Sequence, residues 1–242
     1  GRAPPAHNTL VRLDRYLVER GLVESREKAK RLIQEGKVRV GGKVVQKPAH
    51  PVPEGAAVEL LAEERYVGRG AYKLLGALEA FPVEPRGKVA ADLGASTGGF
   101  TQVLLERGVR RVYAVDVGKG QLHPRLREDP RVVALEEEDA RTLVLPEPVD
   151  LVVMDVSFIS ATYIIKPLFE ALDDGADFVC LIKPQFEVGR EHIGKGGIVK
   201  SDKIREMALA KVCEYAKSVG FEFCGSIVSP IEGGDGNIEY LA

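Results

Sequence analysis

The feature that most constrains this chain is a glycine-rich loop between an apolar run and a helical pattern. Residues 89–93 are apolar apart from Asp92, as in a buried parallel strand, and the apolar residues after the loop follow at helical spacing. Gly94, Gly98 and Gly99 allow a sharp turn and let a ligand approach the N-terminus of that helix. The stretch predicts a nucleotide-type cofactor site in a Rossmann-like α/β sheet.

A second strand supports a cofactor at this loop. Taken alone, the loop could be a tight turn in which Ser96 and Thr97 cap the helix. The apolar run 112–115, however, is followed by Asp116, whose carboxylate can accept hydrogen bonds from both hydroxyl groups of an adenosine ribose. Because Asp92 and Asp116 lie in register near the ends of neighbouring predicted strands, we favour the cofactor site.

The spacing of the loop selects the cofactor. Gly94-x-x-x-Gly98-Gly99 is not G-x-G-x-x-G, and no Lys-Ser/Thr pair completes a phosphate-binding loop. Asp92 would repel a pyrophosphate but suits the ammonium and sulfonium groups of S-adenosylmethionine. Asp139 could hydrogen-bond the adenine or lie in a solvated turn. The candidate cofactor contacts are Asp92, Gly94, Ala95, Ser96, Thr97, Gly98, Gly99, Phe100, Asp116, Val117, Asp139 and Asp155.

Two further strands bring polar side chains to the same edge of the sheet. The predicted strand 150–155 ends in Asp155, and Lys183 follows the strand 178–182. Because ligands bind at the carboxyl ends of parallel strands, we expect Asp92, Asp116 and Asp155 to converge on one crevice. A lysine at a buried strand end needs a partner, for which Asp155 is the nearest candidate; an ordinary salt bridge at the sheet rim is the alternative.

The remaining pattern completes the predicted fold. It indicates a helix over 70–81, a strand at 131–134, a helix over 202–216, and final strands at 221–224 and 238–241. Before them, two helical patterns, the second capped by Ser25, precede a hairpin at 38–45 and a strand at 58–61. We expect a tail or cloning remnant at 1–9, a small α+β domain at 10–62, a linker at 63–69 and the α/β domain at 70–242.

The two parts differ in charge. Residues 1–62 hold 12 Lys and Arg against 7 Asp and Glu, whereas the rest of the chain holds 22 against 29. A basic cluster can be a merely solvated face, but this local excess in an otherwise acidic chain favours binding to a phosphate backbone. The candidate RNA contacts are Arg12, Arg15, Arg26, Lys30, Arg31, Lys37, Arg39, Lys43 and Arg69.

Composition limits the other possibilities. Cys180, Cys213 and Cys224 form no Cys-x-x-Cys pair and have no nearby His, so we expect no metal site and buried thiols in a reducing cytoplasm. No apolar run is long enough to span a bilayer, and the N-terminus lacks the apolar region of a signal peptide. We therefore expect a cytoplasmic protein with no membrane partner.

Three N-terminal motifs carry a resemblance. Arg12-Leu13-Asp14-x-Tyr16-Leu17, Ser25-Arg26-x-x-Ala29 and the run Gly36 to Lys43 resemble the S4 RNA-binding domain of ribosomal small-subunit protein four, pseudouridine synthases and tyrosyl-tRNA synthetases. The resemblance covers about residues 10–61. It implies two helices packed on a small sheet that together grip structured RNA.

The rest of the chain resembles a family of RNA-modifying enzymes. The stretches 92–101, 115–122, 155–160, 183–187, 194–199 and 236–240 are similar to the TlyA (haemolysin A) family of FtsJ-like ribose 2′-O-methyltransferases of ribosomal RNA. The resemblance implies a seven-stranded, mostly parallel class I methyltransferase sheet, S-adenosylmethionine as methyl donor and cytidine ribose hydroxyls as acceptors. It places a Lys-Asp-Lys-Glu catalytic set on Lys73, Asp155, Lys183 and Glu239.

The expected chemistry is in-line transfer of a methyl group, to which positioning contributes most. We expect Lys183 to be the proton acceptor and Asp155 to orient its amine. An oxygen acceptor is favoured over a base nitrogen, because Asp155-Val-Ser-Phe158 lacks the two prolines of amino-methylating relatives. The alternatives are a nicotinamide dehydrogenase, a non-catalytic ribosome-binding protein and a membrane-active haemolysin, for which no amphipathic or apolar segment is found.

The charge division yields a first prediction. Deleting residues 1–62 should leave cofactor binding intact but weaken binding to ribosomal RNA and flatten its salt dependence, because phosphate contacts are lost. Filter binding over a range of salt concentrations measures both quantities. An undiminished salt slope would contradict the assignment.

Overall fold

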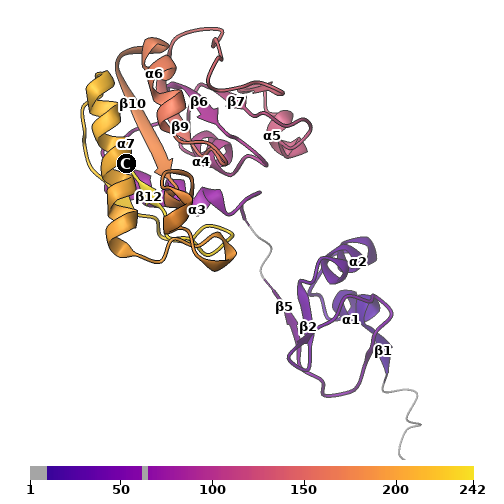
Figure 1. The fold of residues 1–242 in the computed structure, drawn as a ribbon. Coiled ribbons are helices and arrows are strands. Elements are labelled where there is room, and N and C mark those ends of the chain that lie inside the picture. Colours follow the sequence, from indigo (N-terminus) through magenta and orange to yellow (C-terminus); the bar gives the residue numbers. More distant parts are fainter. Residues whose placement is uncertain (1–9, 62–64) are drawn as a thin grey trace, which may run out of the picture. The chain divides into compact units, whose positions relative to one another are not determined.

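The computed structural model describes residues 10–61 and 65–242. The chain divides into two compact units, Gly1–Arg65 and Tyr66–Ala242. Figure 1 shows the helices and strands of each unit. Each unit has an apolar core of its own.

The first unit has the expected α+β form. Helices α1 (Leu13–Glu19) and α2 (Arg26–Gln34) pack together, and the Ser25 side chain caps α2 by accepting from the Lys28 N–H. Strands β2 (Val38–Val40), β3 (Lys43–Val44) and β5 (Val58–Leu60) form a sheet in the order β3-β2-β5, which confirms the hairpin. A second pair, β1 (Val11–Arg12) and β4 (Pro51–Val52), was not predicted, because two-residue strands leave no alternating pattern.

The second unit is built on one seven-stranded sheet. Its strand order is β11-β12-β10-β9-β6-β7-β8. The strand β12 runs in the opposite direction to all the others, which are parallel to one another. This confirms the predicted Rossmann-like sheet. The strands are β6 (Val89–Leu93), β7 (Arg111–Val115), β8 (Val132–Leu135), β9 (Val149–Met154), β10 (Leu172–Ile182), β11 (Ile227–Val228) and β12 (Tyr240–Leu241).

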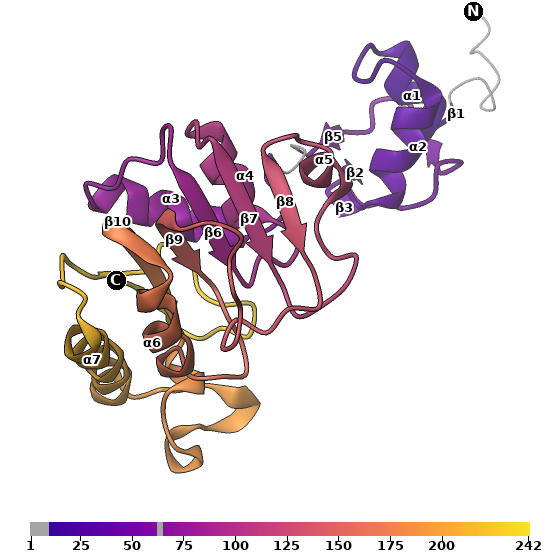
Figure 2. The same cartoon turned by 90° about the horizontal axis from the view of Figure 1, so that it is seen from above.

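Helices cover both faces of this sheet, as Figure 2 shows. Successive residues of a strand point to opposite faces, so Ala90 belongs to the core under α3, α4 and α5, whereas Ala91 belongs to the core under α6 and α7. The helices are α3 (Gly70–Ala80), α4 (Gly99–Glu106), α5 (Pro124–Arg127), α6 (Thr162–Glu170) and α7 (Asp202–Val219), and short 3-10 turns lie at Pro184–Phe186, Arg190–His192 and Lys195–Gly197.

Two predictions near the C-terminal end were wrong. Residues 221–224 form no strand. The edge strand β11 lies further on and is short, because the neighbouring β12 offers only two residues for pairing. Phe221 instead packs its ring against Phe169 and Phe178. Cys224 is exposed rather than buried, whereas Cys180 is buried and Cys213 is half-buried.

The loop after β6 makes a close backbone contact that requires glycine. Gly94 has φ +82°, and a Cβ there would overlap the carbonyl oxygen of Asp155 at the end of β9. Gly120 has a similar φ of +69°, but a Cβ there would meet nothing within 4 Å. The two glycines therefore separate the cost of the backbone conformation from the cost of the contact.

Replacing these glycines tests that contact. Gly94→Ala should lower the free energy of unfolding by about 2–5 kcal/mol, since it adds overlap to an unfavourable backbone conformation. Gly120→Ala should cost only about 1–2 kcal/mol. Urea denaturation of both variants measures the difference. Equal losses of unfolding free energy would show that the backbone at Asp155 moves to admit a Cβ at position 94 without cost.

Candidate active site

Sheet topology brings three predicted catalytic residues to one edge. Strands β9 and β10 are parallel neighbours, so Asp155 and Lys183, which follow them, lie at the same edge. Glu239 directly precedes β12, which is antiparallel to β10 and therefore begins where β10 ends. Ile182 pairs with Tyr240, so the register places Lys183 beside Glu239.

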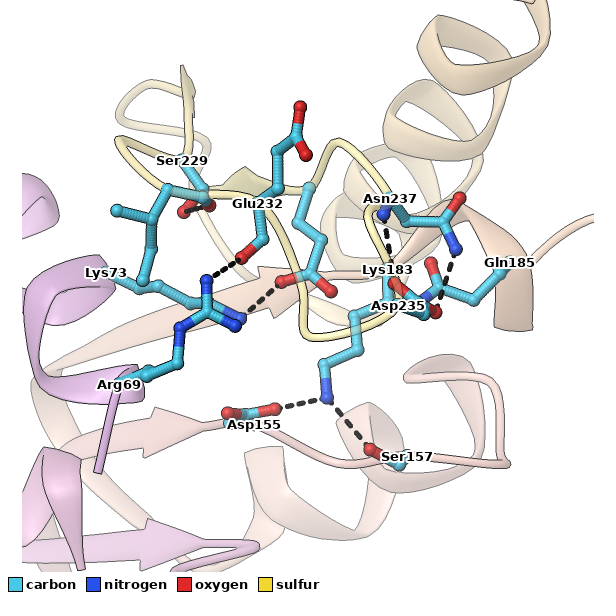
Figure 3. Close-up of polar contacts among 12 residues, drawn as sticks. Arg69, Lys73, Asp155, Ser157, Lys183, Gln185, Ser229, Glu232, Asp235 and Asn237 are labelled. Atoms are coloured by element: carbon cyan, nitrogen blue, oxygen red, sulfur yellow. Dashed lines mark hydrogen bonds and ion pairs between the residues drawn. The ribbon is translucent and has the colours of Figure 1, made fainter. Parts of the chain in front are cut away.

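Lys183 and Asp155 form the predicted ion pair. The Lys183 Nζ lies 2.5 Å from Asp155 Oδ1 and donates a hydrogen bond of 2.9 Å to the Ser157 hydroxyl. The lysine side chain is only 12% exposed, so these acceptors replace most of the water that its amine would otherwise bind. Figure 3 shows the amine held between Asp155 and Ser157.

Lys73 completes the set through a second ion pair. Its Nζ lies 2.7 Å from Glu239 Oε1, and the two side chains are 8% and 2% exposed. The Lys73 side chain points inward from α3. Gly70, at the start of the same helix, lies beside the Asp155 carboxylate, so α3 borders both ion pairs. The four residues form one polar cluster.

A cleft of about 970 Å³ lies next to this cluster, a volume in the range of small-molecule sites. Half of the predicted cofactor contacts line it: Gly94, Ser96, Asp116, Val117, Asp139 and Asp155. The loop after β9 and the turn after β10 supply the opposite wall, where Phe158, with φ +65° and its side chain 90% exposed, packs against Phe186. The cleft therefore lies at the carboxyl edge of the parallel strands, as expected.

The other predicted contacts do not line the cleft: Asp92, Ala95, Thr97, Gly98, Gly99 and Phe100. A Cβ at Gly98 would overlap Leu126 of the neighbouring helix, and a Cβ at Gly99 would lie 2.9 Å from the Ala71 nitrogen. Phe100 is buried in the core. Gly98 and Gly99 therefore allow α4 to pack closely against its neighbours.

Asp92 is placed differently from the prediction. Because it lies one residue before the end of β6, its side chain projects from the sheet face, where it is fully buried and accepts a 2.8 Å hydrogen bond from Thr101. Its Oδ1 has no partner among the described residues. Burial raises the pKa of Asp92 to about 7; the Thr101 hydrogen bond opposes the rise, and the charges of Asp155 and Asp116 add to it.

The two remaining cleft carboxylates have local partners. Asp116 accepts hydrogen bonds from the backbone N–H groups of Ser96 (2.7 Å) and Gly118 (2.8 Å), so it links the loops after β6 and β7. Asp139 accepts from the Arg141 guanidinium, whose hydrogen bonds hold the Asp139 pKa below its usual range. A ligand at Asp139 would share that carboxylate with Arg141.

Sequence reasoning missed two residues that hold the loops after β9 and β10. Ser157 accepts from Lys183, and Glu187 accepts from the Ala161 N–H (2.9 Å) and the Ser160 hydroxyl (2.5 Å). Glu187 thereby ties the turn after β10 to the loop after β9. Both lie in the motifs 155–160 and 183–187, but nothing in the local pattern indicates which side chains they contact.

Most of the predicted RNA contacts lie on the first unit. Of these eight residues, Lys37 is half-buried and the other seven are exposed. Several are paired with nearby carboxylates, such as Arg15 with Glu19. Arg69 belongs to the second unit, where its guanidinium donates to the Glu232 carbonyl.

Within residues 10–61 and 65–242, no group of three or more His, Cys, Asp or Glu is placed to hold a metal ion. No helix in this part of the chain could cross a membrane.

Comparison with known proteins identifies the family. Residues 66–242 match the FtsJ-like methyltransferase family, and residues 11–58 match the S4 domain. A Mycobacterium tuberculosis protein named 16S/23S rRNA (cytidine-2′-O)-methyltransferase TlyA is 47% identical over 237 residues, which are 96% of this chain and 88% of that protein. This chain belongs to the TlyA (haemolysin A) family of FtsJ-like methyltransferases.

Other members of the TlyA family are similarly close. Hemolysin A of Brachyspira hyodysenteriae is 41% identical, over 96% of this chain and 98% of that protein. The solved structure of a putative hemolysin from Streptococcus thermophilus matches with a TM-score of 0.73 and 42% identity, over 96% of this chain and 87% of that one. The resemblance stated from the sequence motifs is thus confirmed.

The buried pair of Lys73 and Glu239 generates a stability prediction. Glu239→Leu should cost about 3–5 kcal/mol of unfolding free energy, because it leaves a buried lysine without its partner. The double variant Lys73→Met/Glu239→Leu should recover most of the loss. Chemical denaturation measures both, and Glu214→Leu, which breaks the exposed pair with Lys217, should change stability by less than about 1 kcal/mol. A double variant no more stable than the single one would contradict the pairing.

Proposed function

We propose that this protein transfers a methyl group from S-adenosylmethionine to the 2′-hydroxyl of a cytidine ribose in ribosomal RNA. The observation that carries the proposal is the pair of lysine–carboxylate contacts, Lys183–Asp155 and Lys73–Glu239, gathered beside the cleft. The names of the M. tuberculosis relative and the matched family support the reaction and its acceptor.

The charges around the cleft fit S-adenosylmethionine. Asp92, Asp116 and Asp155 lie close enough for their charges to act on one another, and Asp92 has a buried oxygen without a partner. A ligand that carries positive charge relieves this repulsion, whereas a pyrophosphate would add to it. Asp116 would hold the ribose hydroxyls, with Gly94 and Ser96 beside it. When bound, the cofactor supplies a methyl group activated by its sulfonium.

Lys183 is the proposed acceptor of the hydroxyl proton. For this step the ammonium of the ion pair must first release a proton to solvent, so that the neutral amine can take the proton of the hydroxyl. Asp155 and Ser157, both in the cleft wall, fix the direction of its amine, so that a hydroxyl brought to this edge meets the nitrogen in a defined orientation. Lys73 and Glu239 are paired and buried behind this edge, where they link α3 to the start of β12. A non-catalytic ribosome-binding protein would have no need for two lysine–carboxylate pairs at one cleft.

The first unit is the proposed grip on RNA. Its exposed lysines and arginines face solvent on a module that matches the S4 domain, while the unit that holds the cleft is acidic overall. Phosphate contacts of this kind give affinity without base specificity. The choice of nucleotide is therefore left to the cleft.

Two substitutions at one position test the mechanism. Lys183→Met should lower the single-turnover rate by roughly two to four powers of ten, the usual worth of a general base, with little change in cofactor affinity. Lys183→Arg should be equally slow, because arginine keeps the charge but cannot accept a proton. The assay follows labelled methyl transfer to ribosomal RNA, and nucleoside analysis identifies the product as 2′-O-methylcytidine.

Lys88→Met is the matched control. Lys88 is also paired with an aspartate, at 3.0 Å from Asp177, but it precedes β6 and so lies at the opposite edge of the sheet. Its replacement should leave the rate unchanged. Near-normal turnover in the arginine variant would reduce Lys183 to a charged clamp, and methylation of a base instead of the ribose would overturn the proposed acceptor.

A further inference from the structure

A buried carboxylate lies beneath the basic surface of the first unit. Asp14, in the first turn of α1, is fully buried, yet it accepts hydrogen bonds from two different arginines. Arg12 donates to both of its oxygens, from Nε (3.2 Å) and Nη2 (3.1 Å), and Arg26 donates from Nη2 (3.3 Å). The Arg15 N–H contributes a fourth contact at 2.8 Å.

The two arginines come from separate elements. Arg12 belongs to β1 and Arg26 is the first residue of α2, and their side chains are 51% and 55% exposed. A guanidinium has five N–H donors, so contact with Asp14 leaves donors of both side chains directed to solvent. Asp14 thus holds two guanidinium groups at one place on the surface while remaining out of reach itself.

The carboxylate is ionised at neutral pH. Burial by itself would raise the pKa of Asp14, but the hydrogen bonds from Arg12, the Arg15 N–H and Arg26 outweigh it and lower the pKa. A charged acceptor with two oxygens can serve both guanidinium groups, which a neutral amide with a single acceptor oxygen cannot do equally well.

We propose that Asp14 is a positioning residue, which orders Arg12 and Arg26 into a site for one phosphate group of the RNA backbone. The inference rests on the proposed role of this unit in binding ribosomal RNA. Guanidinium groups match phosphate oxygens by two-point contacts, and two of them held in place bind without first losing the freedom of long side chains. The buried negative charge thereby strengthens binding to a polyanion.

The sign of one substitution separates this idea from simple charge. Asp14→Asn and Glu19→Gln each remove one negative charge from α1, and electrostatics alone predicts that both tighten RNA binding. Glu19 pairs with Arg15, but both are exposed, so this pair fixes little. We expect Asp14→Asn to weaken binding about tenfold and Glu19→Gln to leave it unchanged or slightly tighter. Filter binding of the full chain to purified 16S and 23S ribosomal RNA without cofactor measures this.

A variant cycle completes the test. Adding Asp14→Asn to Arg12→Ala/Arg26→Ala should weaken binding no further, and in methylation assays Asp14→Asn should raise KM for RNA with kcat unchanged. If Asp14→Asn does not fold, as judged by circular dichroism, the variant Arg12→Lys/Arg26→Lys provides the test. It keeps both positive charges but loses the two-point guanidinium contacts, and it should bind RNA about tenfold more weakly than wild type. A folded Asp14→Asn variant, or the lysine variant, that binds as tightly as wild type would overturn the inference. The filter-binding comparison contains no cofactor, so its outcome stands even if the proposed methyl transfer fails.

Discussion

The arrangement of the second unit around its cleft depends on two buried lysine side chains, each of which requires a carboxylate partner. Lys73 and Lys183 are almost withdrawn from water, so each must lie against an acid, and Glu239 and Asp155 fill that role. Such pairs contribute little net stability, because the charges lose their hydration. What they fix is geometry: α3, the ends of β9 and β10 and the start of β12 are held around one point. That point borders the cleft.

The electrostatics of the cleft follow from the same arrangement. Parallel strands carry Asp116 and Asp155 to one edge, and Asp92 lies beneath them with a pKa raised to about 7. Lysine neutralises only part of this charge, since Lys183 is paired with Asp155 and Lys73 with Glu239. A cationic ligand is thus favoured on the acidic side of the cleft, while the S4 unit offers basic side chains to a polyanion.

Buried carboxylates recur in both units, with different effects. Asp92 lacks enough donors and is difficult to ionise, whereas Asp14 receives them from two arginines and the backbone and is held ionised. Burial alone therefore does not fix the charge of an acid; the hydrogen-bond donors and the charges beside it decide it as well. In the S4 unit the charge of Asp14 lies beneath two exposed arginines and holds their guanidinium groups in place.

The sequence by itself determined most strands of the seven-stranded sheet, the glycine turns and the polar residues at strand ends, because apolar periodicity and residue type are local properties. It also placed Asp155 beside Lys183, since neighbouring parallel strands share an edge. The tertiary structure decided that Lys73 points inward to Glu239, 166 positions away, and that Asp92 faces α4 instead of the cleft. It also moved the edge strand from 221–224 to Ile227–Val228. These outcomes depend on partners far away in the chain, which no local pattern specifies.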